Sequence, residues 1–420
     1  MIPTLARKVS ISSPTPSSTC SLSQNEAPWL FDTQPYGPGA SEHDHPLNDT
    51  PRQPLLPAEY RAATREELDQ RIRRAKALLG ERLLVLGHFY QRDDIVEHAD
   101  FIGDSFQLAQ ATLQRPQAEY IVFCGVHFMA ETADILSQVQ QAVVLPHLGA
   151  GCSMADMADE ASVEACWRQL SAHWPEQIDA AGCQPVVPVT YMNSSAALKA
   201  FCGRHRGIVC TSSNARQVLE WAFARGQRVL FFPDQHLGRN TAHAMGIDAA
   251  QRVVWDPLQP NGGLDADQLE RARVLLWKGH CSLHQRFTVE QIDQARERYP
   301  QVRVIVHPEC NRAVVEAADE NGSTDYIRRA IEAAPAGSVF AIGTEINLVN
   351  RLARQHPEHT VFCLDPVVCP CSTMYRIHPA YLAWVLEGLL EGEVRNRISV
   401  GERVAQEARV ALDRMLAARP

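Results

Sequence analysis

Short apolar runs recur along most of this 420-residue chain, and stretches with helical spacing separate them. Runs such as RLLVLGHFY, YIVFCGV, PVVPVTYM and SVFAIGT are apolar on both faces. Strands have this character when helices cover both sides of a parallel sheet. The alternation of such strands with helices therefore predicts an α/β protein and disfavours the all-α and all-β classes.

The runs also end in a repeated way. RLLVLGHF, PVVPVTYMN and VRVIVHPE each end in a ring-bearing or polar residue, and each precedes a hydroxyl turn, GDS, TSS or GST. Three further runs, VVLPHLGAGC, VLLWKGHC and FCLDPVVC, each deliver a cysteine at or just past the strand end. This order predicts one small α/β unit of about 90 residues repeated three times, with an extra segment around residues 239–265 in the middle copy.

The composition and charge of the chain restrict the partners that the protein is expected to bind and its expected place in the cell. The formal net charge is −9 and no dense basic run occurs, so nucleic acid is not expected as a partner. No window approaches the roughly 18 uninterrupted apolar residues of a membrane helix, and the N-terminus has no apolar signal-peptide core. We therefore predict a cytoplasmic protein. Residues 1–56 are rich in Ser, Pro, Asn and Gln without a hydrophobic period, which predicts a disordered extension.

Cysteines follow strand ends in all three predicted units, at Cys152, Cys281 and the pair Cys369/Cys371. Ligands of open parallel sheets bind beyond the carboxyl ends of the strands. Three thiolates that meet there would bind a soft metal, or an iron-sulfur cluster with one iron lacking a protein ligand. A buried free cysteine is the commoner explanation of any single position, and the CPC segment could instead be a redox pair. The sequence contains no pair of CxxC motifs, so a closed structural zinc site is not expected.

Other strand ends carry groups for acid–base chemistry and anion binding. His88 and His307 close apolar runs, and Glu309 follows as a candidate general acid or base. A single histidine at a strand end is more often a structural group than a catalytic one. We expect neighbouring negative charge to raise the pKa of Glu309 toward neutrality.

The hydroxyl turns after the strands have a local explanation as helix N-caps, although helix N-termini also bind carboxylate and phosphate. The hydroxyl residues are Ser105, Ser212 and Thr324.

A family resemblance rests on motifs in a fixed order from about Pro57 to the C-terminus. They are GHFYQ, DFIGDS, FMAETADIL, CSM, TYMNSSAALKA, CTSSNA, FFPDQHLGRN, WKGHCSLH, HPE, GST and CPCSTM. Together they resemble the quinolinate synthases. Phosphate-binding GxxxxGK[ST] and dinucleotide-binding GxGxxG motifs are absent, so nucleotides are not expected as ligands.

The resemblance implies three pseudo-threefold-related αβα domains, with short parallel sheets around a central iron-sulfur site. We expect a first domain from residues 57–148 with 367–420, a second from 149–276 and a third from 277–366. The implied cofactor is a [4Fe-4S] cluster. Its ligands would be Cys152, Cys281 and Cys371, because Met374 follows Cys371 at the family's spacing, with Cys369 as the alternative third ligand.

The implied reaction condenses iminoaspartate (iminosuccinate) with dihydroxyacetone phosphate to quinolinate in NAD biosynthesis, with release of phosphate and two waters. An L-aspartate oxidase or dehydrogenase would supply the imine. The expected catalytic residues are Glu309, Tyr191 and His307. The expected substrate contacts are His88, Ser105, Tyr191, Met192, Asn193, Ser212, His307, Pro308, Glu309 and Thr324, with Tyr90 and His284 near the cavity.

Two other functions fit parts of the pattern. A cluster- or thiol-based redox sensor without turnover would use the same three units, with CPC as its switch. It would not need His307, Glu309 or the Tyr191/Asn193 pair. A zinc-dependent hydrolase is disfavoured, because the sequence lacks clustered histidine and carboxylate ligands.

Overall fold

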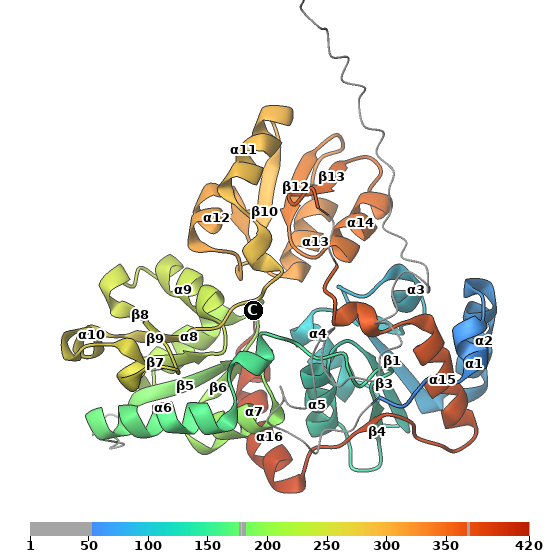
Figure 1. Ribbon diagram of the computed structural model, residues 1–420, viewed down its shortest axis with the longest axis horizontal. Coiled ribbons are helices and arrows are strands. Elements are labelled where there is room, and N and C mark those ends of the chain that lie inside the picture. The colour runs from blue at the N-terminus through green and yellow to red at the C-terminus, as the bar shows by residue number, and fades with distance from the viewer. Residues whose placement is uncertain (1–52, 176–177, 179–181, 368–369, 420) are drawn as a thin grey trace, which may run out of the picture.

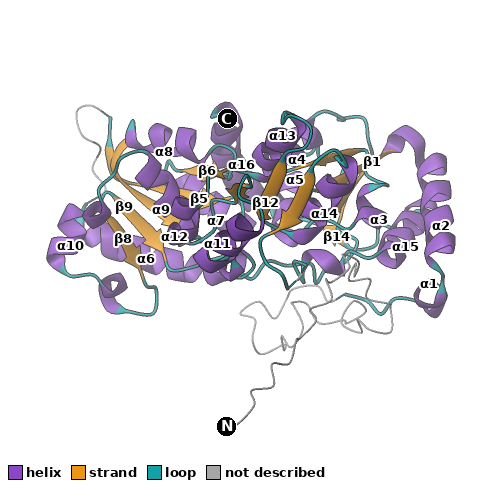
Figure 2. Cartoon of the chain, turned by 90° about the horizontal axis from the view of Figure 1, so that it is seen from above, coloured by secondary structure: helices purple, strands orange, loops and turns teal. Residues whose placement is uncertain are grey.

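The computed structural model describes residues 53–175, 178, 182–367 and 370–419. Three lobes surround a common centre, and each lobe is built on one sheet of short strands flanked by helices (Figure 1). This is the α/β architecture of short, mainly parallel sheets that the apolar runs predict. The view in Figure 2 shows the lobes of the first and second sheets extending to opposite sides of the C-terminal helix.

The first sheet has the strand order β14-β4-β3-β1-β2. All its neighbouring strands are parallel except β14, which pairs antiparallel with β4. The strand β1 is buried along its whole length, with Leu84 opposite Ile121 and Val85 opposite Val122 of β3, so side chains fill both faces. The strands are β1 (Leu83–His88), β2 (Phe101–Gly103), β3 (Tyr120–Cys124), β4 (Ala142–Val144) and β14 (Arg397–Ile398).

The second and third sheets are parallel throughout, with the orders β6-β5-β7-β9-β8 and β11-β10-β12-β13. The second contains β5 (Gln184–Tyr191), β6 (Ile208–Cys210), β7 (Gly226–Phe232), β8 (Arg252–Trp255) and β9 (Val274–Trp277). The third contains β10 (Arg303–Val306), β11 (Glu320–Asn321), β12 (Val339–Gly343) and β13 (Thr360–Cys363).

One strand order recurs in all three sheets and confirms the predicted repeat. In each lobe the first strand of the unit lies between the second and the third, and the last strand lies beyond the third. The orders are β2-β1-β3-β4, β6-β5-β7-β9 and β11-β10-β12-β13. The additional strand β8 lies at the sheet edge and comes from the extra segment at 239–265. The apolar runs singled out from the sequence do not include β2, β8, β11 or β14, which are short edge strands.

The helices cover these sheets and begin at recognisable caps. For example, Thr64 caps α2 with a reciprocal capping box to Glu67. The helices are α1 (Ala58–Ala62), α2 (Arg65–Leu79), α3 (Asp93–Val96), α4 (Ser105–Leu113), α5 (His127–Leu136), α6 (Glu160–His173), α7 (Ala196–Arg204), α8 (Ala215–Phe223), α9 (Gln235–Ala244), α10 (Ala266–Arg271), α11 (Val289–Arg298), α12 (Arg312–Ala317), α13 (Thr324–Glu332), α14 (Ile346–Gln355), α15 (Pro379–Leu390) and α16 (Glu402–Ala417).

The C-terminal segment joins two lobes. Helix α15 packs against α2 of the first lobe, whereas α16 packs against α7 and β6 of the second lobe and also contacts α5. At the other end, Gln53 and Leu56 are buried, so the packed chain begins before residue 57. The predicted extension lies outside the described residues up to position 52. The domain boundaries themselves stay a prediction.

Within the described ranges, no helix combines the length and the apolar character needed to cross a bilayer. The longest helix, α16, carries charged residues along its length and buries only part of its surface.

Candidate active site

A cavity with an empty volume of about 640 Å³ lies where the three lobes meet, and segments of all three line it. Most of its polar residues follow the carboxyl ends of strands. The lining residues are His88, Tyr90, Asp104, Ser105, Val126, Phe128, Met129, Gly151, Cys152, Tyr191, Asn193, Thr211, Ser212, Cys281, His284, His307, Glu309, Thr324, Cys371, Thr373 and Met374.

Equivalent strands of the three lobes deliver ring-bearing residues to this cavity. His88 ends β1, Tyr191 ends β5 and His307 directly follows β10. These three are the first strands of the repeated unit, and each lies inside its sheet between two neighbours. The carboxyl ends of parallel strands lie at the same edge of a sheet, and the three sheets present this edge to the cavity. The repeat therefore brings together three residues that are far apart in the sequence.

Hydroxyl residues follow the second strand of each lobe. Ser105 and Thr324 are the first residues of α4 and α13, and Ser212 lies in the turn before α8. The prediction that these three residues are N-caps is wrong. The N-caps are Asp104, Asn214 and Ser323, and Asp104 and Ser323 cap through their side chains. Ser105, Ser212 and Thr324 are thus not the caps of these helices, and all three line the cavity.

Cysteines follow the last strand of each lobe. Cys152, Cys281 and Cys371 come after β4, β9 and β13 and line the cavity together. Burial raises the pKa of Cys152 to about 12, and it also raises the pKa of Cys281 and Cys371. The other two thiols raise the pKa of Cys281 further through their charge. A thiolate set in this place therefore needs a cation, as a metal centre would provide.

Glu309 is the centre of a buried polar network. Its Oε1 accepts a hydrogen bond of 2.6 Å from the Tyr191 hydroxyl, and its Oε2 lies 2.7 Å from Nδ1 of His284. The ring of His284 stacks on that of His307 with the centroids 4.5 Å apart. One ligand atom each from Cys281, His284 and Glu309 lie within 4.8 Å of one another, so this end of the cavity could hold a metal ion.

The charge state of Glu309 differs from the expectation. Burial favours its neutral form, but the neighbouring His307 and His284 and the hydrogen bond from Tyr191 outweigh burial and lower the pKa to about 2. The predicted upward shift is therefore wrong, because donors rather than negative charges surround this carboxylate. Burial raises the pKa of Tyr191, so its hydroxyl stays protonated. Burial also lowers the pKa of His88 and His307 to about 3, so both rings are neutral near pH 7.

Tyr90 and His284 meet the third lobe through Thr344. The Tyr90 hydroxyl lies 2.7 Å from Thr344 Oγ1, and His284 Nε2 lies 3.3 Å from the same atom. The ring of Tyr90 also packs edge-on against His88 with centroids 4.9 Å apart. The turn after β1 therefore depends on the third lobe for its position.

Some lining residues were not singled out from the sequence. Asp104 is buried, lines the cavity and accepts a hydrogen bond from Ser213, which ties the first lobe to the second. Burial raises its pKa. It lies inside the DFIGDS motif, where the adjacent Ser105 drew attention instead. The others are Val126, Phe128, Met129, Gly151, Thr211, Thr373 and Met374.

Among the described residues, two that were predicted as substrate contacts do not appear in this wall. Met192 is buried and its sulfur accepts a hydrogen bond from Thr132. The carbonyl oxygen of Pro308 accepts a hydrogen bond of 2.9 Å from Asn240. The substrate-binding roles of Met192 and Pro308 stay predictions. Cys369, the alternative third ligand, lies outside the described residues.

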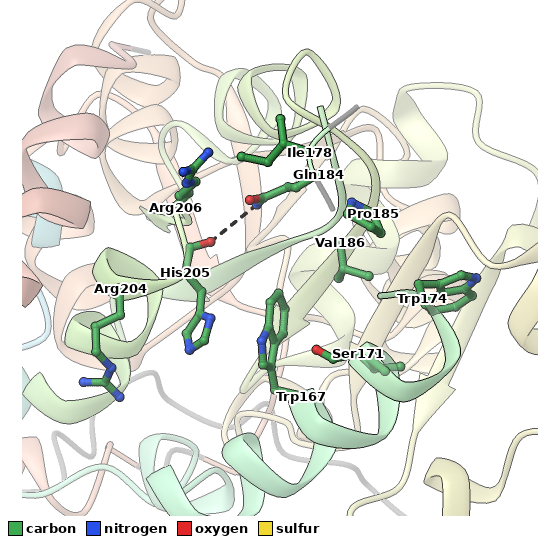
Figure 3. A pocket seen from close by; sticks show the side chains of 11 residues that line it. Trp167, Ser171, Trp174, Ile178, Gln184, Pro185, Val186, Arg204, His205 and Arg206 are labelled. Carbon is green, nitrogen blue, oxygen red and sulfur yellow. Dashed lines mark hydrogen bonds between the residues drawn. The ribbon is translucent and has the colours of Figure 1, made fainter. Parts of the chain in front are cut away.

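A second hollow lies on the second lobe, and its empty volume is about 590 Å³ (Figure 3). The rings of Trp167 and Trp174, the cations Arg204 and Arg206 and the neighbouring His205 form part of its wall. Gln184 donates a hydrogen bond of 3.4 Å to the carbonyl of His205 across this hollow. No cysteine or carboxylate is among its described lining residues, so the groups for the expected chemistry gather in the central cavity.

Comparisons with known proteins agree with this geometry. The family model described as Quinolinate synthetase A protein matches residues 70–417. A quinolinate synthase of Corynebacterium glutamicum is 66% identical over 385 residues, which cover 92% of this chain and 96% of that protein. The quinolinate synthase of Acidobacterium capsulatum is 54% identical over 359 residues, 85% of this chain and 94% of that protein. That of Streptomyces coelicolor is 53% identical over 364 residues, 86% of this chain and 91% of that protein. These relatives are named as enzymes, so a redox sensor without turnover is not supported.

Proposed function

Because the chain belongs to the quinolinate synthase family, an enzyme family of NAD biosynthesis, we propose that it condenses iminoaspartate with dihydroxyacetone phosphate by means of a [4Fe-4S] cluster. The products would be quinolinate, one phosphate and two waters, which balances all atoms without net oxidation or reduction. One observation carries this proposal: thiols from three lobes line the same cavity as the Tyr191–Glu309–His284 network.

The thiols fit an iron-sulfur cluster with three protein ligands. Cys152, Cys281 and Cys371 come from three separate segments, and soft thiolates are the usual ligands of such clusters. Their raised pKa shows that little positive charge of the protein itself stabilises the thiolates. When bound, a cluster with one iron free of a protein ligand supplies a Lewis acid for a substrate oxygen or nitrogen.

The hydroxyl turns suit the anionic groups of both substrates. Iminoaspartate carries two carboxylates and dihydroxyacetone phosphate carries a phosphate. Helices α4 and α13 begin at the cavity wall with Ser105 and Thr324, and a helix N-terminus attracts anions through its free N–H groups. Asn193 and Ser212 add further donors in the second lobe. These residues would bind and orient the substrates.

Glu309 and Tyr191 would handle protons. Glu309 is ionised near pH 7, so it would accept a proton from the carbon of iminoaspartate that attacks the carbonyl. Tyr191 keeps its proton and donates a hydrogen bond to Glu309 in the free enzyme, so it would deliver a proton to a developing hydroxyl group. Neutral His88 and His307 would donate hydrogen bonds without adding charge. An L-aspartate oxidase or dehydrogenase as the source of the imine, and a cytoplasmic location, stay predictions.

The proposal is tested on protein purified without oxygen. We expect a brown protein with about four iron and four sulfide per chain, which forms quinolinate from the two substrates. A colourless zinc protein would contradict the cluster, and a cluster-replete protein that forms no quinolinate would contradict the substrates.

The ligands are tested one at a time. Cys152→Ser, Cys281→Ser and Cys371→Ser should each lose iron and activity together, whereas Cys369→Ser should keep both. Buried Cys310 offers a matched control, since Cys310→Ser removes a thiol that does not line the cavity. Iron loss in Cys369→Ser but not in Cys371→Ser would move the third ligand to Cys369.

A further inference from the structure

The turn after β1 presents its side chains to the cavity and its backbone carbonyls to the third lobe. His88 and Tyr90 line the cavity. The carbonyl of Phe89 accepts a hydrogen bond of 2.9 Å from Nη1 of Arg351, and that of Gln91 accepts one from Nη2 of the same side chain. Asn347 donates to the carbonyl between them, that of Tyr90, at 3.3 Å. Three successive carbonyls of the turn are thus held by side chains of α14.

Arg351 is suited to this task by its burial and by its shape. The residue is only 9% exposed, and its Nε donates to Oδ1 of Asp93 at 2.8 Å. The planar guanidinium therefore contacts two carbonyls of the turn and the carboxylate of Asp93, the first residue of α3, at fixed angles, which a lysine ammonium cannot reproduce. Burial lowers its pKa to about 10, which leaves the side chain charged near pH 7.

The start of α14 is itself tied to the cysteine loop. Glu345 caps this helix by accepting from the amide of Asn347 at 2.7 Å, and its other oxygen accepts from the amide of Cys371 at 3.3 Å. Thr344, directly before this cap, lies 2.7 Å from the Tyr90 hydroxyl. One short segment of the third lobe therefore contacts both the turn that carries His88 and Tyr90 and the loop that carries Cys371.

We propose that Arg351 is a positioning residue for quinolinate formation: it holds the His88–Gln91 turn so that His88 and Tyr90 keep their places opposite the Cys371 loop. Arg351 does not line the cavity, so it acts through the turn and not on the substrate. The effect on turnover rests on the proposed function, whereas the effect on the turn does not.

The same helix offers a matched control. Arg354 lies three residues further along α14 and pairs with the other oxygen of Asp93, but its side chain is 52% exposed and donates no hydrogen bond to a carbonyl of the turn among the described residues. Arg351→Gln and Arg354→Gln thus each remove one charge and one contact with Asp93. Only the first also releases the turn.

The experiment compares Arg351→Gln, Arg351→Lys and Arg354→Gln as anaerobically purified full-length proteins. Misplacing a group by about 1 Å can cost 10²-fold in rate, so Arg351→Gln should lower kcat by about 10- to 100-fold. Arg351→Lys should fall between Arg351→Gln and wild type, and Arg354→Gln should stay within about two-fold of wild type. Iron content should be unchanged in all three variants. Hydrogen–deuterium exchange of the peptide around residues 86–93 should accelerate in Arg351→Gln and not in Arg354→Gln.

Each contrary result is decisive. Equal exchange of this peptide in the Arg351→Gln and Arg354→Gln variants would overturn the inference, as would kcat values that do not differ. If Arg351→Gln does not fold, Arg351→Lys takes its place in both comparisons, and wild-type exchange and kcat in Arg351→Lys would overturn the inference. If the wild type forms no quinolinate, the proposed substrates are wrong, and the exchange comparison alone upholds or overturns the role of Arg351.

Discussion

Glu309 shows how the surroundings of one side chain decide its chemistry. A carboxylate beside thiols and other acids would be pushed toward its neutral form. Here the Tyr191 hydroxyl and the two neighbouring histidines face it, so it is ionised near neutrality. The base role proposed for Glu309 requires an ionised carboxylate, and these neighbours provide one.

Replacing Glu309 by Gln keeps its shape but removes the proton acceptor. We expect quinolinate formation to fall by about 10²-fold or more, as for other general bases. The visible spectrum and iron content should be unchanged, because Glu309 is not proposed as a ligand of the cluster. The control is Glu316→Gln on α12, because the side chain of Glu316 is 57% exposed. This variant should form quinolinate at nearly the wild-type rate. Normal turnover in Glu309→Gln would transfer the base role to another group, with Tyr191 the first to test.

At the scale of elements, the contact between α7 and α16 joins the C-terminus to the second lobe. A Cβ atom at Gly203 would overlap the backbone carbonyl of Glu407, so only glycine allows this close approach. The salt bridge of 2.7 Å between Arg204 and Glu407 lies beside this contact.

Gly203→Ala should therefore separate the two helices and lower the free energy of unfolding by about 1 to 3 kcal/mol, as overpacking does. Chemical denaturation measures the change. Gly401→Ala is the matched control, because a Cβ at Gly401, directly before α16, would meet no atom within 4 Å. Gly401 is the N-cap of α16, where Ala is less favourable than Gly, so the effect should be at most about 1 kcal/mol and smaller than that of Gly203→Ala. Equal stability of the two variants would show that the helices shift apart at no cost.

The N-cap of α15 makes stability depend on pH. His378 accepts a hydrogen bond of 3.2 Å from the amide of Ala380, and burial lowers its pKa from 6.5 to about 3. The folded state keeps this ring neutral, whereas the unfolded chain protonates it below about pH 6.5. The contribution of His378 to the free energy of unfolding is therefore complete above pH 6.5 and is lost as the pH falls toward 3.

His378→Asn keeps an acceptor at this cap and removes the titration. Between pH 7 and 5.5 the wild type should lose about 1 kcal/mol more unfolding free energy than the variant, since each pKa unit corresponds to about 1.4 kcal/mol. Denaturation curves at the two pH values measure this difference. Identical losses in both proteins would show that His378 does not contribute to the pH dependence.

At the scale of the whole molecule, the first described residues, which start at Gln53, pack against distant segments of the chain. The side chain of Gln53 accepts hydrogen bonds from the amide of Leu148 at 2.8 Å and from Asn396 at 3.0 Å, and Leu56 is fully buried. These contacts join the start of the described chain to the segments after β4 and before β14.

Deleting residues 1–52 should leave quinolinate formation within about two-fold of the full chain, because that stretch has no hydrophobic pattern. The longer deletion of residues 1–56 should lower Tm, unlike the shorter one, because it removes the buried Leu56 and the hydrogen bonds of Gln53. Activity and thermal unfolding of the two truncated proteins test this. A large loss of activity in the shorter deletion with the cluster retained would mean that the extension acts at the cavity.

The sequence alone determined the α/β class, the repeat and the residues at strand ends. Strands such as β1 and β5 could be predicted because both faces are buried, which leaves a continuous apolar run. The three-residue strand β2 and the two-residue strand β11 could not be predicted, because so few residues carry no period. The family resemblance placed the cysteines and Glu309, and the repeat explains why they meet.

Three features could not be predicted from the sequence: the charge of Glu309, the place of Asp104 in the cavity wall, and the hydrogen bonds from Arg351 to the turn after β1. Glu309 and its partner Tyr191 are 118 positions apart, and Arg351 and Phe89 are 262 positions apart. No local pattern records such pairs. A pKa and a hydrogen bond depend on which groups lie within a few ångströms, and in this chain the packing of the three lobes sets those neighbours.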